Sequence, residues 1–85
     1  MTRLWVDGER VETWEQEGEL AGFTWRGVPH QVCEVCNRWR VHTRWWVPGG
    51  SVWREYVKVT TDTGLLCQLY RDANGGEWYL ARLYD

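Results

Sequence analysis

Residues 30–47 read HQVCEVCNRWRVHTRWWV, and this stretch decides the fold. Read as a strand, one face carries the mainly apolar set Cys33, Val35, Trp39, Val41 and Trp45. The other face carries Glu34, Cys36, Arg38, Arg40, His42 and Arg44. A helical spacing is the alternative, but it matches only at Val32, Val35, Cys36 and Trp39. The longer alternation favours one long strand near 30–47 that bends at a bulge or corner around Asn37.

Turn signals recur along the rest of the chain at short spacing. They stand at Asp7-Gly8, Glu17-Gly18, Gly27-Val28-Pro29, Pro48-Gly49-Gly50, Asp62-Thr63-Gly64 and Asn74-Gly75-Gly76. An Asp-Gly pair is typical of a type I′ hairpin, so a hairpin is expected at residues 7–8. The sequence predicts an all-β fold with about seven short antiparallel strands in a meander, forming a small barrel or a two-layer sandwich.

The same alternation indicates core residues elsewhere. Residues 53–59 place Trp53, Val57 and Val59 on one face, opposite Arg54, Tyr56 and Lys58. Residues 65–71 are expected to bury Leu65, Cys67 and Leu69. In residues 77–84, either Trp78, Leu80 and Tyr84 or Tyr79, Ala81 and Leu83 face inward, and the pattern allows both.

Length and composition indicate a single domain, residues 1–85. Residues 1–20, an expected acidic N-terminal hairpin, hold six acidic residues against two arginines. Residues 21–85 form the Trp/Arg-rich β core, and nine of the ten basic residues of the chain are arginine. Eight tryptophans exceed what so small a core hides comfortably. Trp25, Trp39, Trp45 and Trp53 are expected inside and Trp46 outside, while Trp5, Trp14 and Trp78 are unassigned.

Cellular location is inferred from segments that the sequence lacks. No apolar run approaches the roughly 20 residues of a membrane span, and no signal-peptide core follows Met1. Three cysteines are an odd number, which argues against a closed set of disulfides. We therefore expect a cytoplasmic protein with reduced thiols and no membrane contact.

Cys33-Glu34-Val35-Cys36 is a single CxxC motif. Zinc would need completion of the site by His30, His42 or Cys67. In a regular strand the side chains of Cys33 and Cys36 point to opposite faces, which favours structural cysteines. A zinc site and a redox or nucleophilic thiol are the alternatives. We expect no metal and no cofactor.

The second motif is a basic, aromatic stripe. We predict that Arg38, Arg40, Arg44, Arg54 and Lys58 share one face and contact phosphates, with Trp46 and Tyr56 as stacking rings. The alternatives are an ordinary solvated face, on which arginine stems cover the rings, and a contact with an acidic protein surface. The acidic residues 1–20 could cover this stripe or pair with another copy of it.

Catalytic motifs are weak. Ser51 is the only serine and lies in an expected turn, and neither His30 nor His42 has a convincing nucleophile or carboxylate beside it. The double glycines lack the helix and lysine of a phosphate-binding loop. We predict a protein without enzymatic activity or a small-molecule substrate.

Several ordered pieces of the sequence resemble a small bacterial Trp/Arg-rich β-domain family of unknown function. The pieces are Phe23-x-Trp-Arg-Gly27, Val35-x-x-x-Trp39-Arg40, Arg44-Trp45-Trp46, Tyr70-Arg71-Asp72 and Glu77-Trp78-Tyr79-Leu80. Members of that family stand alone or form the C-terminal appendage of some error-prone Y-family DNA polymerase-like proteins. The resemblance covers residues 20–85 and implies an association with DNA-repair synthesis.

Together these patterns predict a binding module. The leading hypothesis is a small β-barrel that contacts single-stranded DNA or RNA, or supports a DNA-repair protein partner. The competing hypothesis is a protein-interaction or self-associating module, such as a homodimer, that has no nucleic-acid contact.

Overall fold

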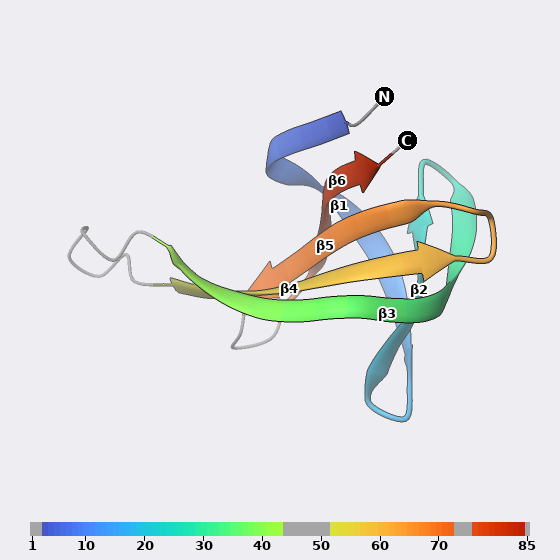
Figure 1. Cartoon of the computed structure of the whole chain (residues 1–85), viewed down its shortest axis with the longest axis horizontal. Helices are drawn as coiled ribbons and strands as arrows, with labels where there is room; N and C mark the ends of the chain where they lie inside the picture. Colours follow the sequence, from blue (N-terminus) through green and yellow to red (C-terminus); the bar gives the residue numbers. More distant parts are fainter. Residues whose placement is uncertain (1–2, 44–51, 73–75, 85) are drawn as a thin grey trace.

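Six antiparallel strands close into one barrel (Figure 1). The computed structural model describes residues 3–43, 52–72 and 76–84. The strands are β1 (Arg3–Gln16), β2 (Glu19–Trp25), β3 (Val28–Thr43), β4 (Val52–Thr61), β5 (Leu66–Asp72) and β6 (Trp78–Tyr84). Each strand pairs with the next, and β6 returns to pair with β1. The predicted all-β barrel is confirmed, with six strands where about seven were expected.

The hairpin expected at Asp7-Gly8 is not formed, which explains why there are fewer strands than expected. β1 runs through this position, and its register against β6 shifts between Leu4 and Glu9. Gly8 does take the left-handed conformation that the Asp-Gly signal implies, with φ of 76°. The conformation produces an irregularity within β1 instead of a turn. The first hairpin turns at Glu17-Gly18, where both residues have positive φ, as a type I′ turn requires.

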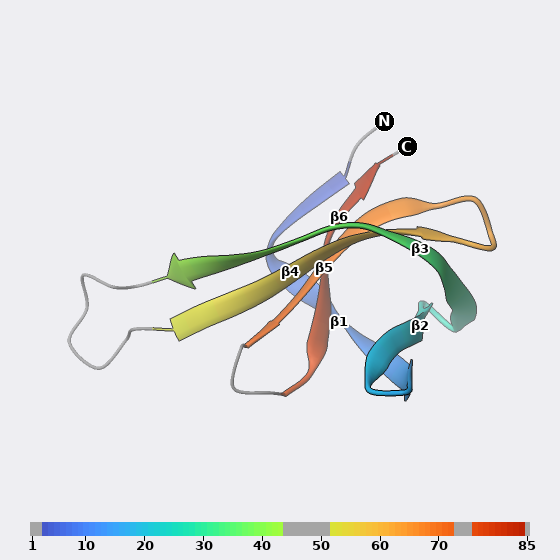
Figure 2. The same cartoon turned by 60° about the horizontal axis from the view of Figure 1, so that its bottom comes forward.

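The predicted long strand is β3, and it contains two bulges. Val32 pairs with Thr61 and Glu34 with Thr60, so Cys33 is an extra residue in the ladder with β4. The same pattern recurs three residues later, where Cys36 is extra between Val35 and Asn37. The bend expected around Asn37 is therefore present, and Figure 2 shows β3 curving along the barrel.

Each bulge moves the side chains that follow it to the other face of the sheet. Beyond Cys36, Arg38 pairs with the buried Val57, and Trp39 pairs with Tyr56. Trp39 and Val41 therefore lie on the outer face of the sheet. Their expected place on the core face is wrong, because the inserted Cys36 reverses the alternation that runs through Val35.

The core consists of side chains on the inward face of the sheet, outside the bulged part of β3. Its fully or nearly buried members are Val11, Phe23, Val57, Val59, Cys67, Leu69, Trp78, Leu80 and Leu83. The expected burial of Cys67 and Leu69 is confirmed, with Leu65 packed against them. In β6 neither predicted set is right alone, because the register against β5 shifts between Gln68 and Leu69. Trp78, Leu80 and Leu83 are thereby buried together.

Fewer tryptophans are buried than the sequence suggested. Trp78 belongs to the core and Trp25 packs against it. Trp53, which was expected inside, is 51% exposed. Trp45 and Trp46 lie outside the described residues.

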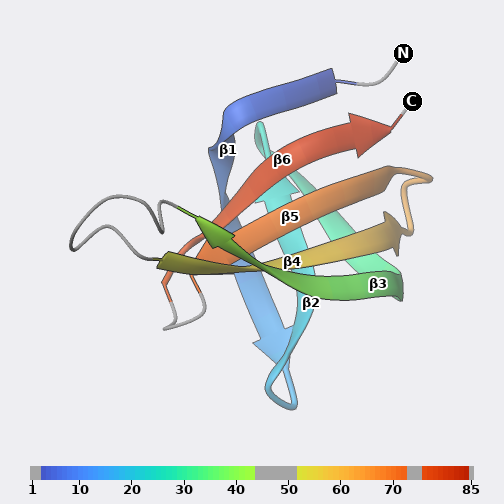
Figure 3. The same cartoon turned by 60° about the vertical axis from the view of Figure 1, so that its left-hand side comes forward.

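Two hairpins extend from the barrel in different directions. The β1–β2 hairpin projects on one side, and the ends of β3 and β4 project on another (Figures 1 and 3). Most of the acidic segment lies in β1, which pairs with β2 in a hairpin and also closes the barrel against β6. Among the residues that the structure describes, no helix is long and apolar enough to cross a membrane.

Candidate nucleic-acid interface

A row of four aromatic rings crosses the outer face of the sheet. Trp39, Tyr56, Tyr70 and Tyr79 are direct cross-strand partners on β3, β4, β5 and β6. Successive ring centroids are 5.4, 5.3 and 5.2 Å apart. The first and last pairs are nearly parallel, with interplanar angles of 7° and 11°, and the middle pair is tilted by 40°. Directly opposed residues on neighbouring strands are close enough for such contacts, so the strand register itself builds the row.

Cations flank this row. The Arg54 guanidinium lies 4.5 Å from the Tyr70 ring centroid, and the Lys58 Nζ lies 4.7 Å from that of Tyr84. Arg82 reaches the same Tyr84 ring at 5.6 Å and donates a hydrogen bond of 3.4 Å to its hydroxyl. We call these eight residues the outer aromatic face: Trp39, Arg54, Tyr56, Lys58, Tyr70, Tyr79, Arg82 and Tyr84.

Arg54 is held firmly in its charged form. Partial burial acts to lower its pKa, but a hydrogen bond with Tyr56 and the charges of Tyr70 and Asp72 outweigh burial and raise the pKa. The guanidinium is therefore fixed between two rings of the row and remains a cation throughout the physiological pH range.

The rings differ in how far they reach solvent. Tyr70 is only 5% exposed, while Trp39, Tyr56 and Tyr79 are half-buried. β1 covers Tyr70: a Cβ at Gly8 would lie 2.9 Å from the Tyr70 hydroxyl oxygen and 2.8 Å from Tyr79 Cβ. Tyr70 is therefore a buried member of the row, and Trp39, Tyr56 and Tyr79 present the accessible aromatic surface.

The structure divides the predicted basic stripe between two faces. Arg54, Tyr56 and Lys58 share the outer aromatic face. Arg38 and Arg40 lie on the opposite face, because they pair with Val57 and Glu55. Their expected position beside Arg54 and Lys58 is wrong, and the bulge at Cys36 is the physical reason, because it moves the residues that follow it to the other face. The predicted residues Arg44 and Trp46 lie outside the described residues.

The opposite face is rich in contacts between acids and arginines. Glu19 of the β1–β2 hairpin lies 3.5 Å from Arg38, and Glu15 lies 3.6 Å from Arg71. Glu55 also approaches Arg71, at 3.7 Å. We call this surface, with Arg38, Arg40, Glu55 and Arg71, the inner basic face. One acid of residues 1–20, Glu19, therefore contacts a residue of the predicted stripe, Arg38, which lies on the inner basic face.

The cysteines and histidines are separated by burial. Cys33 and Cys36 are exposed, whereas Cys67 is fully buried, and burial raises the pKa of its thiol to about 12. His30 is buried, and its Nδ1 lies 2.6 Å from the Thr63 hydroxyl oxygen. His42 stacks on Trp53 with ring centroids 4.5 Å apart. Within the described residues, no group of three or more His, Cys, Asp and Glu side chains could hold a metal ion.

Several members of the outer aromatic face were missed at the sequence level. Tyr70 could have been found, because alternation with the buried Cys67 and Leu69 points Gln68 and Tyr70 outward. Tyr79, Arg82 and Tyr84 depend on the register shift in β6, for which the sequence carries no evident signal.

No protein-family model matches this chain, and no curated protein or solved structure matches it either.

Proposed function

We propose that the chain is a non-enzymatic binding module for single-stranded nucleic acid, and that the outer aromatic face is the binding surface. The cross-strand row of Trp39, Tyr56, Tyr70 and Tyr79 with its flanking cations carries this proposal. Unpaired bases stack on flat side chains, and phosphates bind arginine and lysine. A sheet surface that offers rings and cations within one or two β-strand spacings of each other suits an extended single strand of nucleic acid.

Charge segregation supports the same surface. The whole chain has a net charge of −2, which by itself does not attract a polyanion. However, Glu15 and Glu19 lie against arginines of the inner basic face. The outer face carries Arg54, Lys58 and Arg82 over tyrosine rings. The outer aromatic face therefore carries three cations, with Asp72 beside Arg54, in a chain whose net charge is −2.

The sequence resemblance adds a biological setting to this proposal. An appendage of polymerase-like proteins would act near the single-stranded template or gap that repair synthesis exposes. We therefore propose single-stranded DNA in repair as the first ligand to test, with RNA as the comparison.

A protein-interaction or self-associating module is the second candidate function. It is favoured by two apolar side chains on the projecting β3–β4 hairpin, Trp53 at 51% and Val41 at 37% exposure. They lie on opposite faces of that hairpin, since Trp53 pairs with His42 and Val41 pairs with Arg54. An interface centred on these residues would depend on buried apolar area and would respond weakly to salt.

Fluorescence anisotropy with labelled oligonucleotides tests the proposal. We expect poly-dT of about 15 nucleotides to bind at low salt, with log K falling linearly as log salt concentration rises. Poly-rU of the same length shows whether the sugar matters, and duplex DNA is the control for charge alone. No anisotropy change at about 50 mM salt with any single strand would refute the proposal. Concentration-dependent self-association under those conditions would favour the second candidate.

A further inference from the structure

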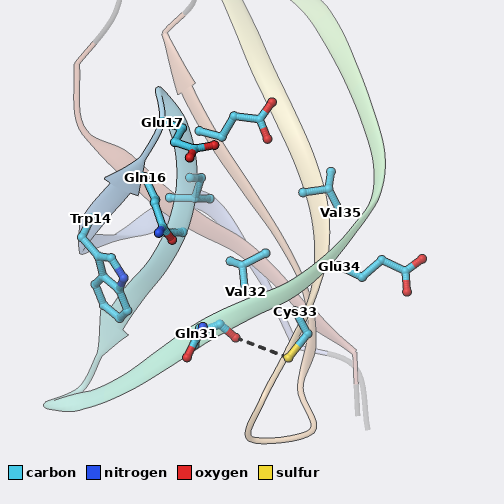
Figure 4. Close-up of a pocket in the computed structure, with 11 residues that line it drawn as sticks. Trp14, Gln16, Glu17, Gln31, Val32, Cys33, Glu34 and Val35 are labelled. Carbon is cyan, nitrogen blue, oxygen red and sulfur yellow. Dashed lines mark hydrogen bonds between the residues drawn. The ribbon is translucent and has the colours of Figure 1, made fainter.

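A groove opens between β2 and β3 where their ladder stops. The two strands pair only from Trp25 with Val28 to Gly22 with Gln31. If the ladder continued, Ala21 would pair with Val32 and Leu20 with Cys33. Instead these residues line a groove of about 430 Å³, together with residues of β1 (Figure 4).

The bulges of β3 explain the separation. Cys33 and Cys36 are the extra residues in the ladder with β4, and bulges bend a strand and increase its twist. β3 consequently follows β4 and leaves the first residues of β2. Within the described part of the chain, Glu19 and Leu20 pair with β1 on one edge only, and Ala21 is an extra residue in that ladder. Their other edge faces the groove, and unpaired edges of this kind accept an additional strand.

The lining of the groove is mainly polar, with a few apolar side chains and with glutamates at its rim. Leu20, Val32 and Val35 are partly buried and pack against the core. Trp14 forms a wall, because its ring lies over Gly22 and only 2.1 Å from where a Cβ would stand there. Figure 4 shows Val32 directed toward the groove and Glu34 directed away from it. The glutamates at the rim are Glu17 and Glu19, both exposed.

We infer that this groove binds a short, extended, basic peptide segment of a partner protein. The segment's main chain pairs with the free edge of Glu19–Ala21, and its apolar side chains contact Leu20 and Val32. Its lysines or arginines face Glu17 and compete with Arg38 for Glu19. Nucleic acid does not fit this rim, because the carboxylates repel phosphates. The β3 residues that line the groove, Gln31–Val35, precede Trp39, and the other rings of the row lie on β4, β5 and β6, so this inference does not depend on the proposed function.

The geometry also limits the length of the segment. Only three residues of β2 offer a free edge, and the bulges of β3 interrupt a regular ladder on the facing side. Three or four residues of the partner are therefore enough to fill the groove, with about one strand position of 3.3 Å for each.

The test uses the full chain and the blocked peptide Lys-Val-Lys-Val-Lys-Val as the probe. We expect saturable binding, with slower amide hydrogen exchange in Glu19–Ala21 when the peptide is present. Glu17→Lys should weaken binding by about fivefold. Glu12→Lys is the matched control, because Glu12 is an exposed glutamate of the same hairpin that does not line the groove.

Three outcomes would overturn the inference. One is an equal effect of Glu12→Lys and Glu17→Lys, and another is equal binding of Lys-Ser-Lys-Ser-Lys-Ser, since either shows attraction by charge alone. The third is unchanged amide exchange in β2 at saturating peptide. Tyr56→Ala should retain peptide binding. A negative result for peptide binding in the groove is therefore distinct from a negative result for nucleic-acid binding on the outer aromatic face.

Discussion

Trp39 of β3 stacks on Tyr56 of β4, with ring centroids 5.4 Å apart and planes within 7° of parallel. The two rings meet because the two bulges of β3 together shift its register against β4 by two residues. Without the inserted Cys33 and Cys36, the register from Val32 and Thr61 would place Trp39 opposite Arg54, and the aromatic row would begin at Tyr56. The bulges therefore determine the composition of the proposed binding surface.

Tyr56→Ala tests the row at its centre. Loss of one stacking ring should weaken single-stranded DNA binding by about 1–3 kcal/mol, which is roughly five- to 150-fold in Kd. The measurement is fluorescence anisotropy with poly-dT, accompanied by a thermal melt to confirm folding. Trp53→Ala is the control, because it removes an exposed ring from the other face. Equal losses in the two variants would argue against a site on the outer face.

Lys58→Gln and Arg38→Gln separate the two basic faces. Each variant removes one cation, but only Lys58 lies on the outer aromatic face, whereas Arg38 faces Glu19 at 3.5 Å. The slope of log K against log salt concentration should become shallower by about 0.7 for Lys58→Gln and stay constant for Arg38→Gln. Anisotropy titrations at several salt concentrations measure both slopes. The reverse pattern would place the phosphate contacts on the inner basic face.

Gly8→Ala should be strongly destabilising. The residue has φ of 76°, and an added Cβ would lie 2.8 Å from Tyr79 Cβ and 2.9 Å from the Tyr70 ring. Backbone strain and overpacking therefore add together. Gly64→Ala is the matched control, with φ of 86° but nothing within 4 Å of the added Cβ. We expect the free energy of unfolding in urea to fall by about 1–3 kcal/mol more for Gly8→Ala. Equal losses would show that β1 does not press on these rings.

The buried thiol of Cys67 should make the free energy of unfolding fall as the pH rises into the alkaline range. Its thiol has a pKa of about 12 in the folded chain against 9.0 for the free group, because burial disfavours the thiolate. Between these values the unfolded chain loses the proton while the folded chain keeps it. The stabilising contribution is complete below about pH 9 and declines as pH rises toward 12.

Comparison with Cys67→Ala isolates this contribution from other groups that titrate at high pH. The difference in unfolding free energy between the wild type and the variant should shrink by at most about 2 kcal/mol from about pH 8 to about pH 10.5. Urea titrations at the two pH values provide the measurement. A constant difference would mean that the thiol is solvated in the folded state.

The parts of the fold that were predictable depend on neighbours in sequence. Glu17-Gly18 supplies the positive φ values of a tight hairpin, and alternation around Cys67 and Leu69 identifies the buried face of β5. These signals are local, so the sequence alone reveals them. The all-β barrel follows from several of them in succession.

The parts that were not predictable depend on a partner strand. The left-handed conformation of Gly8 fits either a hairpin turn or an irregularity within a strand. Pairing of β1 with β6 decides for the irregular strand, and the local sequence does not show that pairing. The bulge at Cys33 likewise exists only in relation to Thr60 and Thr61 of β4. The bulge at Cys36 has the same origin, and because the prediction assumed strict alternation across it, the predicted basic stripe joined residues of two faces. The candidate site was therefore half recognised: Arg54, Tyr56 and Lys58 were found, and the rings that complete it were not.

The ladder between β1 and β6 sets the order in which this barrel forms. It joins Arg3 to Leu83 and Val11 to Trp78, pairs that are separated by most of the chain. The four hairpin ladders from β2 to β6 join close neighbours and close small loops, which costs less chain entropy. We therefore expect a late folding transition state in which an open sheet already exists and its two outer strands meet last. During synthesis this final step waits for the last strand, so the unclosed sheet is the species most exposed to wrong pairing with another chain.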